Sequence, residues 1–162
     1  MTIEQILQKM IGYEGHTTHD VAHLLKVWGY AHTIGLLEHL DERTLHTLEI
    51  AAIVHDIACP LCRIRYGNTN GKYQELESPA LVRAFLSDCG LDASELERIV
   101  YLVSHHHTIT DVQGLDYQIL LEADFLVNAD ESSLSLENIR KMNEVLFKTK
   151  TGKALLKSIY KF

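Results

Sequence analysis

Residues 48–56 read LEIAAIVHD and decide the fold class. Their apolar side chains predict a buried helix that ends at His55 and Asp56. A buried carboxylate without a partner costs several kcal/mol, so a His-Asp pair at the end of a core helix needs a counter-charge. A divalent metal ion is the strongest such partner. We therefore expect further metal ligands elsewhere in the chain.

The composition is that of one globular domain. Of the 162 residues, 46% are apolar and 23% are charged, which is enough to bury a core. Only two prolines and nine glycines interrupt the chain, which favours long helices. The net charge of −7 argues against a nucleic-acid polymer as partner, because no basic surplus can displace counterions. A small anionic substrate is still compatible if a metal or a local basic group attracts it.

The cysteines and the N-terminus bear on the compartment. Cys59, Cys62 and Cys89 make an odd number, so no disulfide framework is implied. The first residues lack the basic-then-apolar pattern of a signal peptide. No run of about 18 apolar residues predicts a membrane span. We expect a cytoplasmic protein with no membrane partner.

Apolar residues at helical spacing predict an all-α helical bundle with a single domain over residues 1–162. We expect helices over about residues 3–10, 18–40, 41–56, 75–89, 92–107, 116–127, 135–147 and 153–160. Thr18 or Asp20 is expected to cap the second helix and Asp41 the third. Pro60 should stop the helix that carries the His-Asp pair.

Residues 59–72 contain two glycines and two asparagines and predict a loop. A loop of this length is often functional. Its Arg63, Arg65 and Lys72 form the one compact basic group of an acidic chain. These side chains either contact a substrate phosphate or belong to a solvated surface.

Two further residues have the character of inward-facing ligands. His23 shares an apolar stripe with Val27 and Ile34, and Asp124 lies four residues after Leu120 on another predicted core face. Alone, either could be a hydrogen-bonded core residue. Together with the His-Asp pair they give two imidazoles and two carboxylates. Such a set suits one divalent transition metal (Mn, Fe, Ni, Co or Zn) rather than calcium or an all-thiolate zinc site.

Two other motifs are weaker. His105, His106 and His107 are consecutive, so at most one or two of them can face a common site. The Cys59-Pro60-Leu61-Cys62 motif lacks the second cysteine pair that a structural zinc site needs. It also lacks the βαβ context of a redox motif, so we attribute it to packing.

The order of these ligands resembles the HD superfamily of metal-dependent phosphohydrolases. Residues 20–27, 51–57 and 122–126 are similar to the family's first-histidine, His-Asp and closing Ala-Asp segments. The resemblance covers about residues 16–130, with C-terminal helices over residues 131–162. It implies an all-helical bundle that hydrolyses a phosphoester of a small molecule, with a nucleotide as the leading substrate class. It implies four metal ligands: His23, His55, Asp56 and Asp124.

The chain departs from the family in two places. Relatives with two metals place further histidines between the His-Asp pair and the last Asp, where this chain has Gln74, Glu75 and Glu77. His105–His107 could supply others, so we expect one ion and leave a second open. Cys59 occupies the position at which some single-metal relatives carry a catalytic Glu, and that role is not carried over.

The expected mechanism is attack by a metal-activated water on phosphorus. We expect catalytic roles for Asp56, Arg63 and His106. We expect substrate contacts from Arg63, Arg65, Lys72, His106 and His107. Two other functions stay open: a di-iron oxygenase on the same fold, and a non-catalytic sensor that binds a metal or a nucleotide. A homo-oligomer is compatible with all three.

Overall fold

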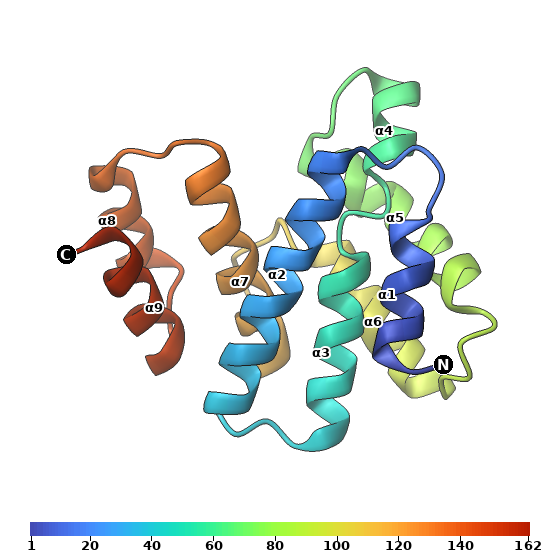
Figure 1. The fold of residues 1–162 in the computed structure, drawn as a ribbon, viewed down its shortest axis with the longest axis horizontal. Coiled ribbons are helices and arrows are strands. Elements are labelled where there is room, and N and C mark those ends of the chain that lie inside the picture. Colours follow the sequence, from blue (N-terminus) through green and yellow to red (C-terminus); the bar gives the residue numbers. More distant parts are fainter.

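The computed structural model describes residues 1–162, and the chain is helical from end to end (Figure 1). Its nine helices are α1 (Ile3–Ile11), α2 (Thr18–Leu37), α3 (Glu42–Val54), α4 (Cys59–Tyr66), α5 (Gly71–Leu86), α6 (Ala93–His105), α7 (Leu115–Glu131), α8 (Leu136–Val145) and α9 (Lys150–Tyr160). The prediction of an all-α fold is confirmed.

Helix α3 is the centre of the bundle. Every residue from Thr47 to Val54 is buried, so the helix is covered on all sides. Helices α1, α2, α6 and α7 pack around it. The stretch Glu42–Tyr66 is long and apolar enough to cross a membrane, but 83% of its most apolar window is buried inside the protein, as in a core helix. This packing fixes the position of the His-Asp pair, which follows α3 directly.

The starts of the helices agree with the expected capping chemistry, with one correction. Asp41 caps α3 by accepting a hydrogen bond from the backbone N–H of Thr44. Helix α2 is capped by Thr17 and not by Thr18 or Asp20. Asp20 is the third residue of that helix, and its side chain accepts a hydrogen bond from the backbone N–H of Thr17 in a capping box.

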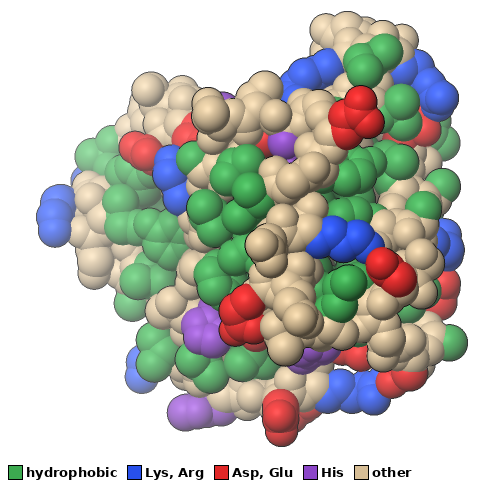
Figure 2. Space-filling model, turned by 45° about the vertical axis from the view of Figure 1, so that its right-hand side comes forward, with side chains coloured by type: hydrophobic (Ala, Val, Ile, Leu, Met, Phe, Trp, Pro, Cys, Tyr) green, Lys and Arg blue, Asp and Glu red, His purple; other side chains and the backbone are tan.

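The prediction of a loop over residues 59–72 is wrong. Helix α4 begins at Cys59, and only four residues, Gly67–Asn70, separate it from α5. Pro60 lies in the first turn of α4, where its missing N–H costs nothing and its fixed φ suits a helix. Proline therefore starts a new helix here, after a turn that contains His55 and Asp56. Helix α4 protrudes from the bundle (Figure 1), and in Figure 2 this part of the surface carries Lys and Arg side chains.

The C-terminal helices pack through α7. Helix α9 contacts α7 and α2, while α8 packs on α9. Glu122 of α7 is completely buried and accepts hydrogen bonds from the backbone N–H groups of Lys148 and Thr149, at 2.7 and 2.9 Å. Asp124 lies two residues further along α7 and therefore points away from Glu122. Helix α7 thus directs Glu122 toward the start of α9 and Asp124 toward its opposite face.

Candidate metal centre

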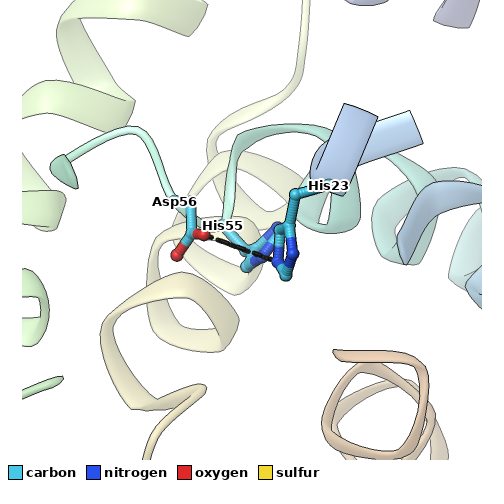
Figure 3. Close-up of side chains that lie close together, drawn as sticks. All are labelled: His23, His55 and Asp56. Carbon is cyan, nitrogen blue, oxygen red and sulfur yellow. Dashed lines mark hydrogen bonds and ion pairs between the residues drawn. The ribbon is translucent and has the colours of Figure 1, made fainter. Parts of the chain in front are cut away.

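Four side chains converge from three parts of the chain. His23 comes from α2, His55 and Asp56 from the turn after α3, and Asp124 from α7. His23 Nε2 lies 3.2 Å from His55 Nε2, 3.3 Å from Asp124 Oδ1 and 3.5 Å from Asp56 Oδ2. Figure 3 shows the two imidazoles and the Asp56 carboxylate turned toward one another. Ligand atoms on an ion with bonds of about 2.0–2.2 Å lie about 3–3.6 Å apart, so these separations fit a common ion.

The tautomers of both imidazoles are set by their other ring nitrogen. His23 Nδ1 is 2.8 Å from Glu131 Oε2, and His55 Nδ1 is 2.8 Å from the carbonyl oxygen of Ala52. Both partners accept hydrogen bonds only, so each Nδ1 carries a hydrogen. Each neutral ring then presents its Nε2 lone pair, and the two lone pairs face each other. They require a positive charge between them, which a metal ion or a proton can supply.

The charges of the site favour that cation. Burial lowers the pKa of His23, but the hydrogen bond to Asp124 and the charges of Asp56 and Asp124 outweigh it and raise the pKa to about 9. Burial raises the pKa of Asp124, yet the hydrogen bonds with His23 and His55 hold that pKa well below its usual range. The carboxylates thus make the centre attractive to positive charge, and the residues present fit a divalent ion.

His106 adds a second group of ligand type beside Asp56. It is buried at the end of α6, and its Nδ1 donates to the carbonyl oxygen of Val103 at 2.7 Å. Its Nε2 has no hydrogen-bond partner and lies 3.5 Å from Asp56 Oδ1. One ligand atom each of Asp56, His106 and His107 lie within 4.8 Å of one another. His105 does not belong to this group. Its side chain points elsewhere, and its Nδ1 donates to the carbonyl oxygen of Tyr101.

A cavity of about 250 Å³ opens onto these residues. It is lined by His19, Asp20, His23, Asp56, Cys59, Arg63, Thr69, Gln74, His107, Asp124, Asn128 and Glu131. Cys59 is the one apolar member. Burial and the charge of Asp56 raise the pKa of its thiol, so it is protonated at neutral pH.

Of the three basic residues that were expected at the substrate, only Arg63 lines the cavity. Arg65 instead pairs with Glu77 at 2.6 Å, and the Lys72 ammonium lies over the ring of Tyr73 at 4.7 Å. The side chains of residues 63 and 65 point in different directions, because residues two positions apart on an α-helix are rotated by about 200° around its axis. The interpretation of this segment as a loop had hidden that difference.

Several residues of the site were missed from the sequence. Asn128 Nδ2 donates to Asp124 Oδ1 at 2.8 Å, and Glu131 orients His23. Asn128 and Glu131 lie four and seven residues after Asp124, on the same face of α7. That spacing is visible in the sequence and could have indicated both.

Comparisons with known proteins address the fold. No protein-family model matches the chain, and no curated protein does. The crystal structure of a predicted HD superfamily hydrolase from an uncultured Thermotogales bacterium aligns with a TM-score of 0.68 at 23% identity, over 99% of this chain and 84% of that one. The chain has the HD-domain fold. The HD-domain likeness includes α8 and α9, whereas the resemblance in sequence stops near residue 130.

Proposed function

We propose that the protein is a metal-dependent phosphohydrolase of the HD type that acts on a phosphoester of a small molecule. The observation that carries the proposal is the convergence of two imidazole lone pairs and two carboxylates beside a polar cavity. The nitrogen/oxygen set suits Mn, Fe, Ni, Co or Zn. The similar crystal structure is also of a predicted HD superfamily hydrolase.

In this proposal His23, His55, Asp56 and Asp124 hold the ion. A divalent ion, when bound, polarises a phosphoryl oxygen and acidifies a water molecule. Asp56 is the half-exposed member of the four, with 28% of its side chain accessible, and its carboxylate orients the attacking water. Arg63 donates hydrogen bonds to the phosphoryl oxygens from the cavity wall. We assign His106 a supporting role in this reaction, because its Nε2 has no hydrogen-bond partner and lies beside the other oxygen of Asp56.

A screen of phosphomonoesters, nucleotides and cyclic dinucleotides with each candidate metal tests this reaction. The nucleotides are included because the sequence resemblance names them as the leading class. We expect turnover that depends on added metal. Asp56→Ala should abolish metal binding, whereas Arg63→Ala should leave the metal bound and raise KM several-fold. Metal-loaded protein that hydrolyses no phosphoester would disprove the proposal.

A di-iron oxygenase is the second candidate, and the grouping of Asp56, His106 and His107 favours it. Asp56 would belong to both ligand groups, because its Oδ2 lies 3.5 Å from His23 and its Oδ1 lies 3.5 Å from His106. Loading with iron under anaerobic conditions distinguishes the two. Two irons per chain and uptake of dioxygen would support the oxygenase, and about one ion per chain would support the mononuclear phosphohydrolase.

A further inference from the structure

Arg63 is the one guanidinium or ammonium group that lines the cavity, and a carboxylate already holds it. Its two terminal nitrogens lie 2.9 and 2.5 Å from the two oxygens of Asp20, in a bidentate pair. Asp20 is held in turn by the capping box of α2, where it accepts from the backbone N–H of Thr17 at 2.8 Å. Only 9% of the Asp20 side chain is exposed. The guanidinium is therefore fixed in place between α2 and α4, with its charge largely neutralised.

The other charges of the cavity are negative. Asp20, Asp56, Asp124 and Glu131 face the single guanidinium of Arg63. Lys26 pairs with Glu131 at 3.1 Å but does not line the cavity, so a bound divalent ion would bring the net charge of these groups only to about zero at neutral pH with neutral histidines. The ion and the remaining N–H groups of Arg63 can meet one phosphoryl group. Each further phosphate would bring negative charge into a cavity that has no free cation to receive it.

We propose that Asp20 is a specificity-determining residue that restricts the cavity to phosphomonoesters. By holding Arg63 it leaves enough positive charge for one phosphoryl group and too little for a diphosphate or a triphosphate. The cavity volume of about 250 Å³ lies below the range of about 300–1,000 Å³ usual for small-molecule sites, which also favours a compact substrate. That the ligand is a phosphoester rests on the proposed function. The selection between one phosphoryl group and several, which we call the charge selection, concerns binding alone.

Calorimetric titration of the metal-loaded protein with inorganic phosphate and with pyrophosphate tests this selection. The metal content is measured before and after titration, so that extraction of the ion by pyrophosphate is detected. The native protein should bind phosphate about fivefold more tightly than pyrophosphate or better. Asp20→Asn keeps an oxygen for the Thr17 N–H but removes the charge that neutralises Arg63. Its affinity for pyrophosphate relative to phosphate should rise about tenfold, the value of one charge-assisted hydrogen bond.

Asp116→Asn is the matched control. Asp116 forms the chain's other buried bidentate pair, with Arg98 at 2.9 and 2.6 Å, and does not line the cavity. This variant should change neither affinity. The double variant Asp20→Asn with Arg63→Gln should lose the gain in pyrophosphate binding, because no guanidinium is left to release.

Two results would overturn the inference: tighter binding of pyrophosphate than of phosphate by the native protein, or an unchanged ratio in Asp20→Asn. They are separable from a failure of the proposed reaction. A protein that shows the expected binding order but hydrolyses no phosphoester would disprove the reaction and leave the charge selection standing. A native enzyme that hydrolyses triphosphates as fast as monophosphates would confirm the reaction and disprove the selection.

Discussion

Glu122 and Asp124 are both buried carboxylates of α7, two residues apart, and the chain treats them in opposite ways. Glu122 receives four hydrogen bonds from the chain itself: from the N–H groups of Lys148 and Thr149, the amide of Gln118 and the hydroxyl of Thr149. Asp124 receives one such bond, from Asn128. Its other neighbours are the Nε2 atoms of His23 and His55, at 3.3 and 3.6 Å.

The difference distinguishes a carboxylate that the chain itself satisfies from one that is open to a cation. Backbone and side-chain donors satisfy the charge of Glu122 permanently, so this residue needs nothing from outside the chain. The neighbours of Asp124 are themselves lone pairs, which satisfy a carboxylate only when a proton or a metal lies between them. Burial alone would not distinguish the two residues, whereas the kind of partner does.

Glu122→Ala should be the most damaging change, and metal should not alter its effect. It leaves the backbone N–H groups of Lys148 and Thr149 and the hydroxyl of Thr149 without this acceptor where α9 begins. We expect a loss of about 4 kcal/mol in the free energy of unfolding. Denaturant titrations with and without metal should show the same loss. A loss that appears only in the metal-loaded protein would place Glu122 in the metal site and end the contrast with Asp124.

Asp124→Asn should behave in the opposite manner. Metal that binds only the folded protein stabilises it by about 2.7 kcal/mol at a free concentration of one hundred times Kd. Asn keeps the shape of Asp but loses the charge, so most of this increment should disappear. The Tm of the metal-loaded variant should fall markedly, while that of the chelator-stripped variant should change little or rise through relief of carboxylate repulsion. Equal shifts in both forms would remove Asp124 from the site.

The stability of the metal-free protein should depend on pH through the residues that surround Asp124. The pKa of His23 is raised from 6.5 to about 9. The stabilisation of the folded protein by protonated His23 is therefore fully present below about pH 6.5 and is lost as the pH rises through 9. We expect the free energy of unfolding to fall by about 2 kcal/mol between pH 7 and pH 9.5. The metal-loaded protein should not show this fall, because its imidazoles bind the ion and carry no such proton.

The variant His23→Gln provides the control for this measurement. It should abolish most of the dependence of the metal-free protein between pH 7 and pH 9.5. A metal-free native protein whose stability is flat across this window would show that the carboxylates do not hold a proton on His23.

The convergence of His23, His55, Asp56 and Asp124 could be predicted from the sequence because burial and the chemical type of a side chain are both local properties. The five residues before His55, from Ile50 to Val54, are all apolar and buried, and only a core helix accommodates such a run. Helix α4 could not be predicted in this way. It has only eight residues, of which Cys59, Pro60 and Cys62 are buried, so its apolar stripe is too short to predict a helix. Pro60 lies in its first turn and Gly67 caps its end.

Pairings between distant residues were equally hidden. Asp20 and Arg63 are 43 positions apart, and the interpretation of residues 59–72 as a loop gave Arg63 no fixed direction. Only the tertiary structure, which brings Arg63 of α4 to Asp20 at the start of α2, shows that the expected phosphate contact is already paired. The sequence thus predicted which four side chains converge, while the tertiary structure shows the balance of charges around them.

The smallest expected effect concerns Glu131, whose character lies between those of Glu122 and Asp124. It accepts from His23 Nδ1 at 2.8 Å and from Lys26 at 3.1 Å, so it is satisfied by the chain and yet contacts a proposed ligand of the ion. Such a carboxylate orients the ring and increases its basicity, and its loss typically weakens metal affinity about 10-fold to 100-fold. Glu131→Gln retains an oxygen that can accept from His23 Nδ1, so we expect the lower end, about tenfold, in a competition titration with a chelating indicator. Asp130→Asn is the control, because Asp130 is exposed on the same helix and carries the same charge. Equal losses in the two variants would mean that general charge, and not the contact with His23, sets the affinity. If Glu131→Gln loses nothing, Glu131 belongs with Glu122 as a purely structural carboxylate.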